Sequence, residues 1–217
     1  MLEQRRVERA EALARERKQQ QVRRWGLVGV GVAIVALIVY AIVRAVQPAP
    51  PAPVITGTGT FTAAPTGETR DGMSCLGTEG TLEHIHMYLA IYIDGQQYPV
   101  PANTGIVNNN QCFYPLHVHG DQGDANIIHE ESPSHDTYTL GAFFDIWGQQ
   151  LSRTQVLGNK ADAKHALTFV TFDENGKKTV VTGNPLGIKF TPHETIYILY
   201  NSPNVTPQPY TQFLAGE

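Results

Sequence analysis

Residues 82–93 read LEHIHMYLAIYI, and this run decides the fold of the chain. Large apolar side chains stand at every second position from Ile85 to Ile93, and His84 and His86 occupy positions between them. Successive side chains of an extended strand point to opposite faces, so the apolar set predicts a core face. The two imidazoles then lie together on the other face, beside Tyr88. We therefore expect a long strand at 82–93.

A second pair of histidines lies in residues 112–131, which read CFYPLHVHGDQGDANIIHEE. His117 and His119 are again two positions apart, and His129 follows a turn rich in Gly and Asp. Burying five imidazoles without partners would cost roughly 1–3 kcal/mol each. If the two histidine strands pair or face one another, four imidazoles meet around one point and suit copper or zinc. The open alternatives are a polar network and an exposed histidine face.

The predicted metal site combines ligands with supporting carboxylates. The predicted ligands are His84, His86, His117, His119 and His129, of which His129 is either the fifth ligand or a supporting residue. The carboxylates predicted to orient the imidazole N–H groups are those of Glu83, Asp121, Glu130 and Glu131. Copper is the expected cofactor because imidazoles outside the cytoplasm suit Cu(II) and Met73 or Met87 could help to hold Cu(I); zinc is the alternative.

Three kinds of function are consistent with such a site. The first is extracytoplasmic metal handling or redox protection. The second is a metal-dependent oxidoreductase or hydrolase, in which a coordination position stays open for water and Glu130 or Glu131 serves as general base. The third is a metal-free accessory or interaction subunit of a membrane complex. The sequence holds no Ser/His/Asp or phosphate-loop pattern that would indicate metal-free catalysis.

The N-terminal part of the chain has the pattern of a membrane anchor. Residues 1–24 carry eight Lys/Arg and four Glu and predict a charged cytoplasmic helix. Residues 26–43 are uncharged, and with their flanking residues they reach the roughly 20 residues needed to cross a bilayer. Basic residues crowd before this run and only Arg44 follows closely, so we expect a single-pass anchor at 25–47 with a cytoplasmic N-terminus. A cleaved signal peptide is the alternative, but the run is long and is followed by QPAPP.

The remainder of the chain is acidic and carries both cysteines. From residue 65 onward seven Lys/Arg stand against sixteen Asp/Glu, a formal charge of −9. That excess argues against nucleic acid as a partner. The predicted partners are the lipid bilayer, reached through the anchor, and a membrane protein complex. Outside the cytoplasm Cys75 and Cys112 predict a disulfide, and a thiolate ligand at Cys112 is the alternative.

The other motifs predict a mainly β domain. Further strands are expected at 96–101, 112–119, 125–131, 165–173, 178–182 and 195–201, and a short helix capped by Thr139 is expected at 139–148. Seven or eight short strands with one helix predict an antiparallel β-sandwich or open barrel, cupredoxin-like or similar. The predicted boundaries are a Pro/Thr/Gly-rich linker at 48–69, the extracytoplasmic β-domain at 70–201 and a Pro-rich tail at 202–217.

Several motifs resemble those of a family of membrane-anchored extracytoplasmic bacterial proteins. They are H-x-H at 84–86, C-x-Y-x-L-H-x-H at 112–119, I-I-H-x-E-S-P at 127–133 and T-L-G-x-F-F-x-I-W-G-Q at 139–149. The resemblance covers about residues 71–200 and implies an anchored domain outside the cytoplasm, without naming an activity. The H-V-H at 117–119 also resembles the copper/zinc superoxide dismutases and the multicopper oxidases, but the further ligands of those families have no counterpart here.

Overall fold

The computed structural model describes residues 2–46, 51–120 and 126–213; within the first helix it describes the side chains of residues 15, 17–26 and 33–46. The chain divides into two compact units, Met1–Pro51 and Ala52–Glu217.

The first unit is a single helix, α1 (Leu2–Val46), which includes the predicted charged helix and most of the predicted anchor. Among the described residues, no helix is both long enough and apolar enough to cross a membrane. The predicted span at 25–47 contains residue 47 and the side chains of 27–32, which lie outside the described part of the chain, so the anchor stays a prediction.

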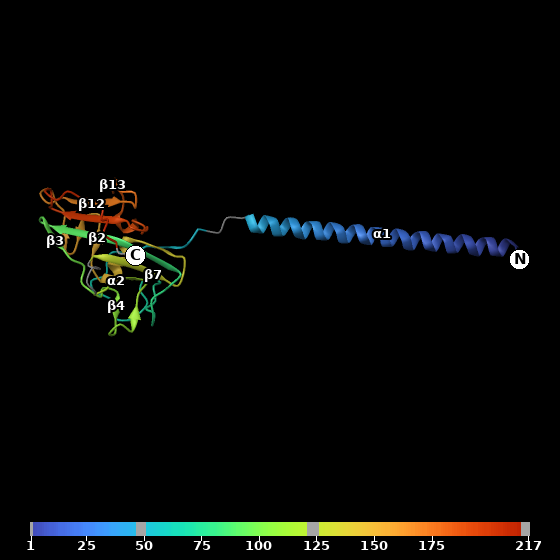
Figure 1. Ribbon diagram of the computed structural model, residues 1–217, viewed down its shortest axis with the longest axis horizontal. Coiled ribbons are helices and arrows are strands. Elements are labelled where there is room, and N and C mark those ends of the chain that lie inside the picture. Colours follow the sequence, from blue (N-terminus) through green and yellow to red (C-terminus); the bar gives the residue numbers. More distant parts are fainter. Residues whose placement is uncertain (1, 47–50, 121–125, 214–217) are drawn as a thin grey trace. The chain divides into compact units, whose positions relative to one another are not determined.

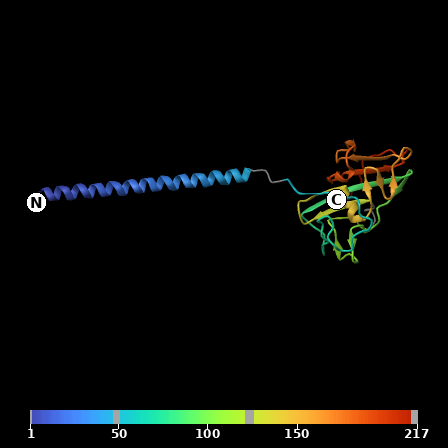
Figure 2. The same cartoon turned by 180° about the vertical axis from the view of Figure 1, so that it is seen from behind.

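The second unit is built on one large sheet (Figure 1, Figure 2). The strand order is β13 (Lys178–Val180), β12 (Leu167–Phe172), β14 (Thr195–Tyr200), β2 (Glu83–Ile93), β7 (Ile127–Ser132) and β6 (Leu116–His117), and β3 (Gln96–Tyr98) pairs with the end of β2. Neighbouring strands are antiparallel except β14 and β2, which are parallel. Within the described residues β13 and β6 do not pair with each other, so the sheet is open.

β2 is a central strand of the sheet, and its alternating pattern explains why. Met87 and Leu89 are fully buried on its apolar face and share one core with the aromatic side chains of α2 (Leu140–Trp147). The Thr139 side chain accepts a hydrogen bond from the first turn of α2, and Gly148 ends the helix in the left-handed region, with φ of 71°. The prediction of a short, Thr-capped helix with buried aromatic residues is confirmed.

Smaller sheets complete the unit. They are β1 (Val54–Ile55) with β8 (Thr137–Tyr138), β4 (Ile106–Val107) with β5 (Cys112–Phe113), and β9 (Leu151–Ser152), β10 (Gln155–Val156) and β11 (Asn159–Lys160) together; η1 (Pro185–Gly187) is a short 3₁₀ helix. The prediction of a mainly β domain is confirmed, and the several sheets are consistent with a β-sandwich. The prediction of a wholly antiparallel arrangement is wrong, because β14 pairs with β2 and β1 pairs with β8 in parallel.

Part of the predicted linker belongs to the domain. A Cβ at Gly57 would stand 2.2 Å from the carbonyl carbon of Gly141 in α2, so the two backbones are in contact there. The backbone amides of Thr58 and Gly59 donate hydrogen bonds to the Asp145 carboxylate, the latter at 3.2 Å. The compact unit therefore begins before the predicted boundary at residue 70. Backbone contacts of Gly and Thr leave no apolar periodicity that would reveal this packing in the sequence.

The two cysteines form the predicted disulfide. Cys75 and Cys112 are joined with 5.3 Å between their Cα atoms, so the alternative of a thiolate ligand at Cys112 is wrong. The strand predicted at 112–119 is divided into β5 and β6. Pro115 lies between them, and a proline has no N–H group for a strand ladder.

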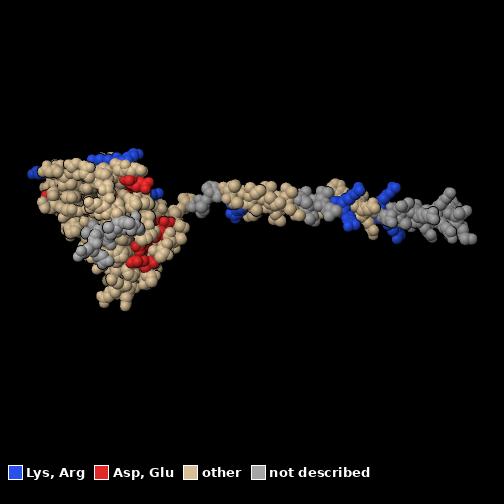
Figure 3. Space-filling view, in the orientation of Figure 1, with Lys and Arg blue, Asp and Glu red and all other residues tan. Residues whose placement is uncertain are grey.

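Charged side chains are distributed unevenly over this unit. In the view of Figure 3, Lys and Arg side chains lie along the edge formed by β12 and β13, and Asp and Glu side chains gather elsewhere on the same face. β12 and β13 are at the opposite end of the strand order from β6 and β7. The basic side chains of that edge therefore lie apart from the strands that carry the histidines.

Candidate metal centre

Three adjacent strands place their histidines in one row. β7 lies between β2 and β6, and the register pairs His86 of β2 with His129 of β7, and His129 with His117 of β6. Residues opposite each other on neighbouring strands have Cβ atoms about 4.5–5.5 Å apart. The two H-x-H segments are therefore not paired with each other, and His129, predicted as a fifth or supporting ligand, is at the centre.

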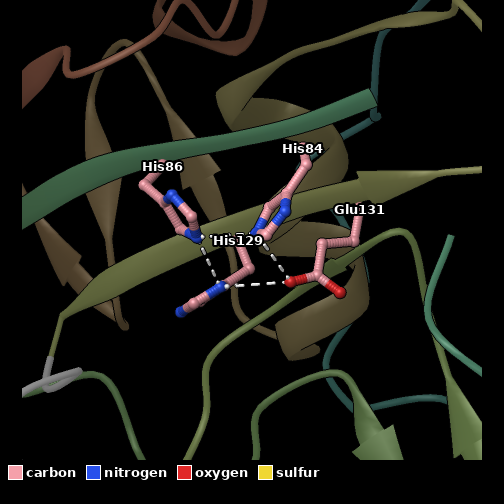
Figure 4. A group of neighbouring side chains, drawn as sticks. All are labelled: His84, His86, His129 and Glu131. Carbon is pink, nitrogen blue, oxygen red and sulfur yellow. Dashed lines mark hydrogen bonds and ion pairs between the residues drawn. The ribbon is translucent and has the colours of Figure 1, made fainter. Parts of the chain in front are cut away.

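The first group of side chains contains His84, His86, His129 and Glu131, which converge in Figure 4. Nε2 of His86 lies 3.2 Å from Nε2 of His84 and 2.8 Å from Nδ1 of His129. Oε1 of Glu131 lies 3.2 Å from Nε2 of His84 and 3.4 Å from Nδ1 of His129. Ligand atoms bound at about 2.0–2.1 Å to a tetrahedral ion are about 3.3 Å from one another. The spacing in this group therefore suits one metal ion.

The second group contains His117 and His119 together with the same His129 and Glu131. The Nε2 atoms of His117 and His119 are 3.2 Å apart, and Nε2 of His117 is 3.9 Å from Oε2 of Glu131. The ring of His119 meets the ring of His129 edge-on, with 4.3 Å between centroids. Each H-x-H pair thus supplies two nitrogen donors at a tetrahedral spacing, and the residues of β7 are common to both groups.

The orientation of His117 exposes one nitrogen to the site. Its Nδ1–H donates a hydrogen bond of 2.9 Å to the carbonyl oxygen of Tyr114, because a carbonyl only accepts. The lone pair is then on Nε2, which faces His119 and Glu131. Burial lowers the pKa of the His117 imidazole to about 4, although the bond to Tyr114 and the charge of Glu131 act in the opposite direction. At neutral pH His117 is therefore the neutral imidazole that a metal requires.

The site is closed on one side and open on the other. The side chains of His117, His129 and Glu131 are 0%, 6% and 7% exposed, whereas those of His84 and His119 are 50% and 24% exposed. An ion can reach the site past the two exposed imidazoles. It is then held by side chains whose positions the sheet fixes.

Glu131 is a ligand candidate, whereas its neighbour Glu130 is not. The two are consecutive in β7, so their side chains point to opposite faces of the sheet. Burial alone would raise the pKa of Glu131, but the hydrogen bond with His129 and the nearby imidazoles outweigh burial and lower it. Burial, then the negative charges of Glu83 and Asp136, raise the pKa of Glu130 to about 8. The prediction that Glu130 orients an imidazole or acts as general base at this site is therefore wrong.

Of the other predicted carboxylates, Glu83 does not support the site. Glu83 makes a short contact with Nδ1 of His135 and lies on the same face of β2 as Ile85, so its predicted role is wrong. Asp121 lies outside the described residues. Sequence reasoning missed Glu79, whose Oε1 is 3.7 Å from Nε2 of His119. No pattern in the sequence marks Glu79, because it precedes β2 in a segment without strand or helix.

The remaining three histidines take part in contacts elsewhere in the domain. His165 pairs with Asp162 at 2.9 Å, and His135 contacts Glu83. The backbone N–H of His193 donates to the carbonyl oxygen of His86, which ties the turn before β14 to β2. None of these three belongs to the groups of described residues that could hold a metal.

The candidate ligand atoms of the two described groups are nitrogen and oxygen atoms. Met73 and Met87 are buried in the hydrophobic core, and Met87 lies on the face of β2 opposite the histidines. The prediction that Met87 helps to hold Cu(I) is therefore wrong. Imidazole and carboxylate together suit divalent copper or zinc.

No protein-family model, no curated protein and no solved structure matches this chain.

Proposed function

We propose that this chain is a membrane-tethered, extracytoplasmic protein that binds a divalent transition metal, copper in preference to zinc, in metal handling or redox protection. The observation that carries the proposal is the row of His86, His129 and His117 across three strands with Glu131 beside it. These side chains have the spacing of metal ligands and lie on one face of a fixed sheet. The disulfide between Cys75 and Cys112 supports an oxidising compartment.

Several features of the site favour a bound ion over a polar network. His117 is fully buried with its Nε2 turned towards other nitrogen and carboxylate atoms, and it is neutral at pH 7. When the nitrogen atoms of two neutral imidazoles face each other, either a proton or a metal ion must lie between them. One ion can satisfy several of these lone pairs at once. The carboxylate of Glu131 supplies the negative charge that a divalent ion needs.

Copper is preferred on ligand chemistry. For a given set of nitrogen and oxygen donors, divalent copper binds more tightly than divalent zinc. The exposed imidazoles of His84 and His119 give the ion a way in and out, which suits a protein that takes up and passes on metal. The tether rests on the uncharged run at 26–43 and the basic residues before it.

A metal titration tests the proposal. The full chain, purified without a metal-binding tag and stripped of metal, is titrated with Cu(II) and with Zn(II) by calorimetry. We expect saturable binding of both, tighter for Cu(II). His86→Ala should weaken binding by at least the 10–100-fold that loss of a supporting residue costs. His165→Ala removes a histidine outside the site and should bind as the unaltered chain does. No saturable binding of either metal would refute the proposal and leave a metal-free interaction subunit.

A further inference from the structure

We propose that the site holds two metal ions, with the Glu131 carboxylate as the bridge between them. This inference rests on the proposed metal-binding function and extends it. The first ion is assigned to His84, His86, Nδ1 of His129 and Oε1 of Glu131. The second ion is assigned to His117, His119 and Oε2 of Glu131.

The number and grouping of donors exceed what one ion takes. Six side chains converge, whereas a tetrahedral site uses four ligands. They form two groups, and in each group the ligand atoms lie within 4.8 Å of one another. His84 and His86 belong to the first group only, and His117 and His119 to the second only. One ion at the first group would leave the second pair of nitrogen atoms, 3.2 Å apart, without a metal.

The two oxygen atoms of Glu131 face different groups. Oε1 lies 3.2 Å from Nε2 of His84, in the first group, and Oε2 lies 3.9 Å from Nε2 of His117, in the second. A carboxylate that offers one oxygen to each of two ions holds them at the separation found in two-metal sites, about 3.5–4 Å. Glu131 is central because its strand, β7, runs between β2, which carries His84 and His86, and β6, which ends at His117.

His129 lies between the two groups in the same way. Its ring is edge-on to His86 and to His119, each with 4.3 Å between centroids, and stacks on His117 at 5.6 Å. Nδ1 faces His86 and Glu131, whereas the second ring nitrogen points away from the first group in Figure 4. The imidazole of His129 therefore lies between the two proposed ion positions and borders both.

The two proposed ion positions differ in the number of donor atoms that the protein supplies. The first has four donors from the protein and so forms a complete tetrahedral site. The second keeps three of its group once Nδ1 of His129 is assigned to the first ion, so a water molecule or a small anion can complete its coordination. Glu79, whose side chain is 40% exposed, stands 3.7 Å from His119 and adds negative charge at this second position. We expect the first position to fill before the second, and the second to exchange its ion faster.

The test is a Cu(II) titration of the untagged full chain, followed by elemental analysis and electron paramagnetic resonance. We expect two equivalents of copper, with an isolated Cu(II) signal after the first that falls as the second binds and the two spins couple. His84→Ala/His86→Ala and His117→Ala/His119→Ala should each retain one equivalent with an isolated signal. Glu131→Gln should abolish the coupling.

Glu130→Gln is the matched control, because it removes the neighbouring carboxylate on the opposite face of β7. It should keep two equivalents and the coupled spectrum. One equivalent in the unaltered chain would overturn the two-ion site and leave the proposed function intact. Two equivalents with uncoupled spectra that Glu131→Gln does not change would overturn the bridge. No bound copper would overturn the proposed function itself.

Discussion

Replacing Glu130 by glutamine should change how the stability of the metal-free protein depends on pH. Glu130 is 4% exposed on the core side of β7, and burial together with Glu83 and Asp136 raises its pKa from 4.5 to about 8. In the folded protein the group is therefore protonated up to about pH 8, whereas in the unfolded chain it ionises near pH 4.5. Folding thus favours the protonated form.

The sign and size of the effect follow from linkage. Between pH 4.5 and pH 8 the unfolded state binds fewer protons than the folded state, so the free energy of unfolding falls as pH rises. A shift from 4.5 to about 8, at about 1.36 kcal/mol per pKa unit, sets the loss at up to about 5 kcal/mol. Glu130→Gln keeps the shape of the protonated side chain and cannot ionise, so the variant does not lose this part of the free energy of unfolding as pH rises.

The assay is urea denaturation of both metal-free proteins at pH 5 and at pH 8.5. Burial lowers the pKa of His117, so protonation of this group lowers the free energy of unfolding as pH falls from 6.5 towards 4. Both proteins carry His117, so the difference between their free energies of unfolding reports on Glu130. We expect similar free energies of unfolding at pH 5 and a more stable variant at pH 8.5. A difference between the proteins that is the same at both pH values would refute the buried, protonated Glu130.

Three further changes test the packing of the β-domain. Reduction of the disulfide between Cys75 and Cys112, 37 residues apart, should lower the free energy of unfolding by about 4 kcal/mol in the chain-entropy model; thermal melts with and without reductant measure it, and unchanged melts would contradict the bond. Gly57→Ala would place a Cβ against the backbone of Gly141, so we expect faster hydrogen exchange at residues 54–59, and unchanged exchange would contradict the contact. Asp145→Asn weakens the acceptor of the hydrogen bond from the Gly59 amide and should lower the free energy of unfolding by about 1–2 kcal/mol, measured by urea denaturation. An unchanged free energy of unfolding would refute this role of Asp145.

The sequence was sufficient to predict the central strand and the face that carries its histidines. Alternation of Met87 and Leu89 with His84 and His86 is a local property of an extended chain, and the structure keeps it. The short helix before Gly148 was predictable for the same reason, since capping and burial depend on neighbouring residues. The predicted five histidines do converge in the folded chain.

The arrangement of strands could not be read in the same way. Which strand lies beside β2 is decided by pairing across many residues, and nothing local shows that β7 separates the two histidine pairs. The pairing of the strands also places His129 at the centre of the candidate metal site and Glu131 among its candidate ligands. Strand parity alone does separate Glu131 from Glu130, because only Glu131 is two positions from His129. Glu79 is brought to His119 by a segment that follows no periodic pattern.

The most direct test of the metal centre is anomalous diffraction at the copper absorption edge, on crystals of the copper-loaded chain. We expect two peaks on either side of the Glu131 carboxylate, one at about 2.0–2.2 Å from Nε2 of His86 and one at that distance from Nε2 of His117. Copper bound only at histidines away from this row, such as His135 or His165, or no ordered copper at all, would contradict it.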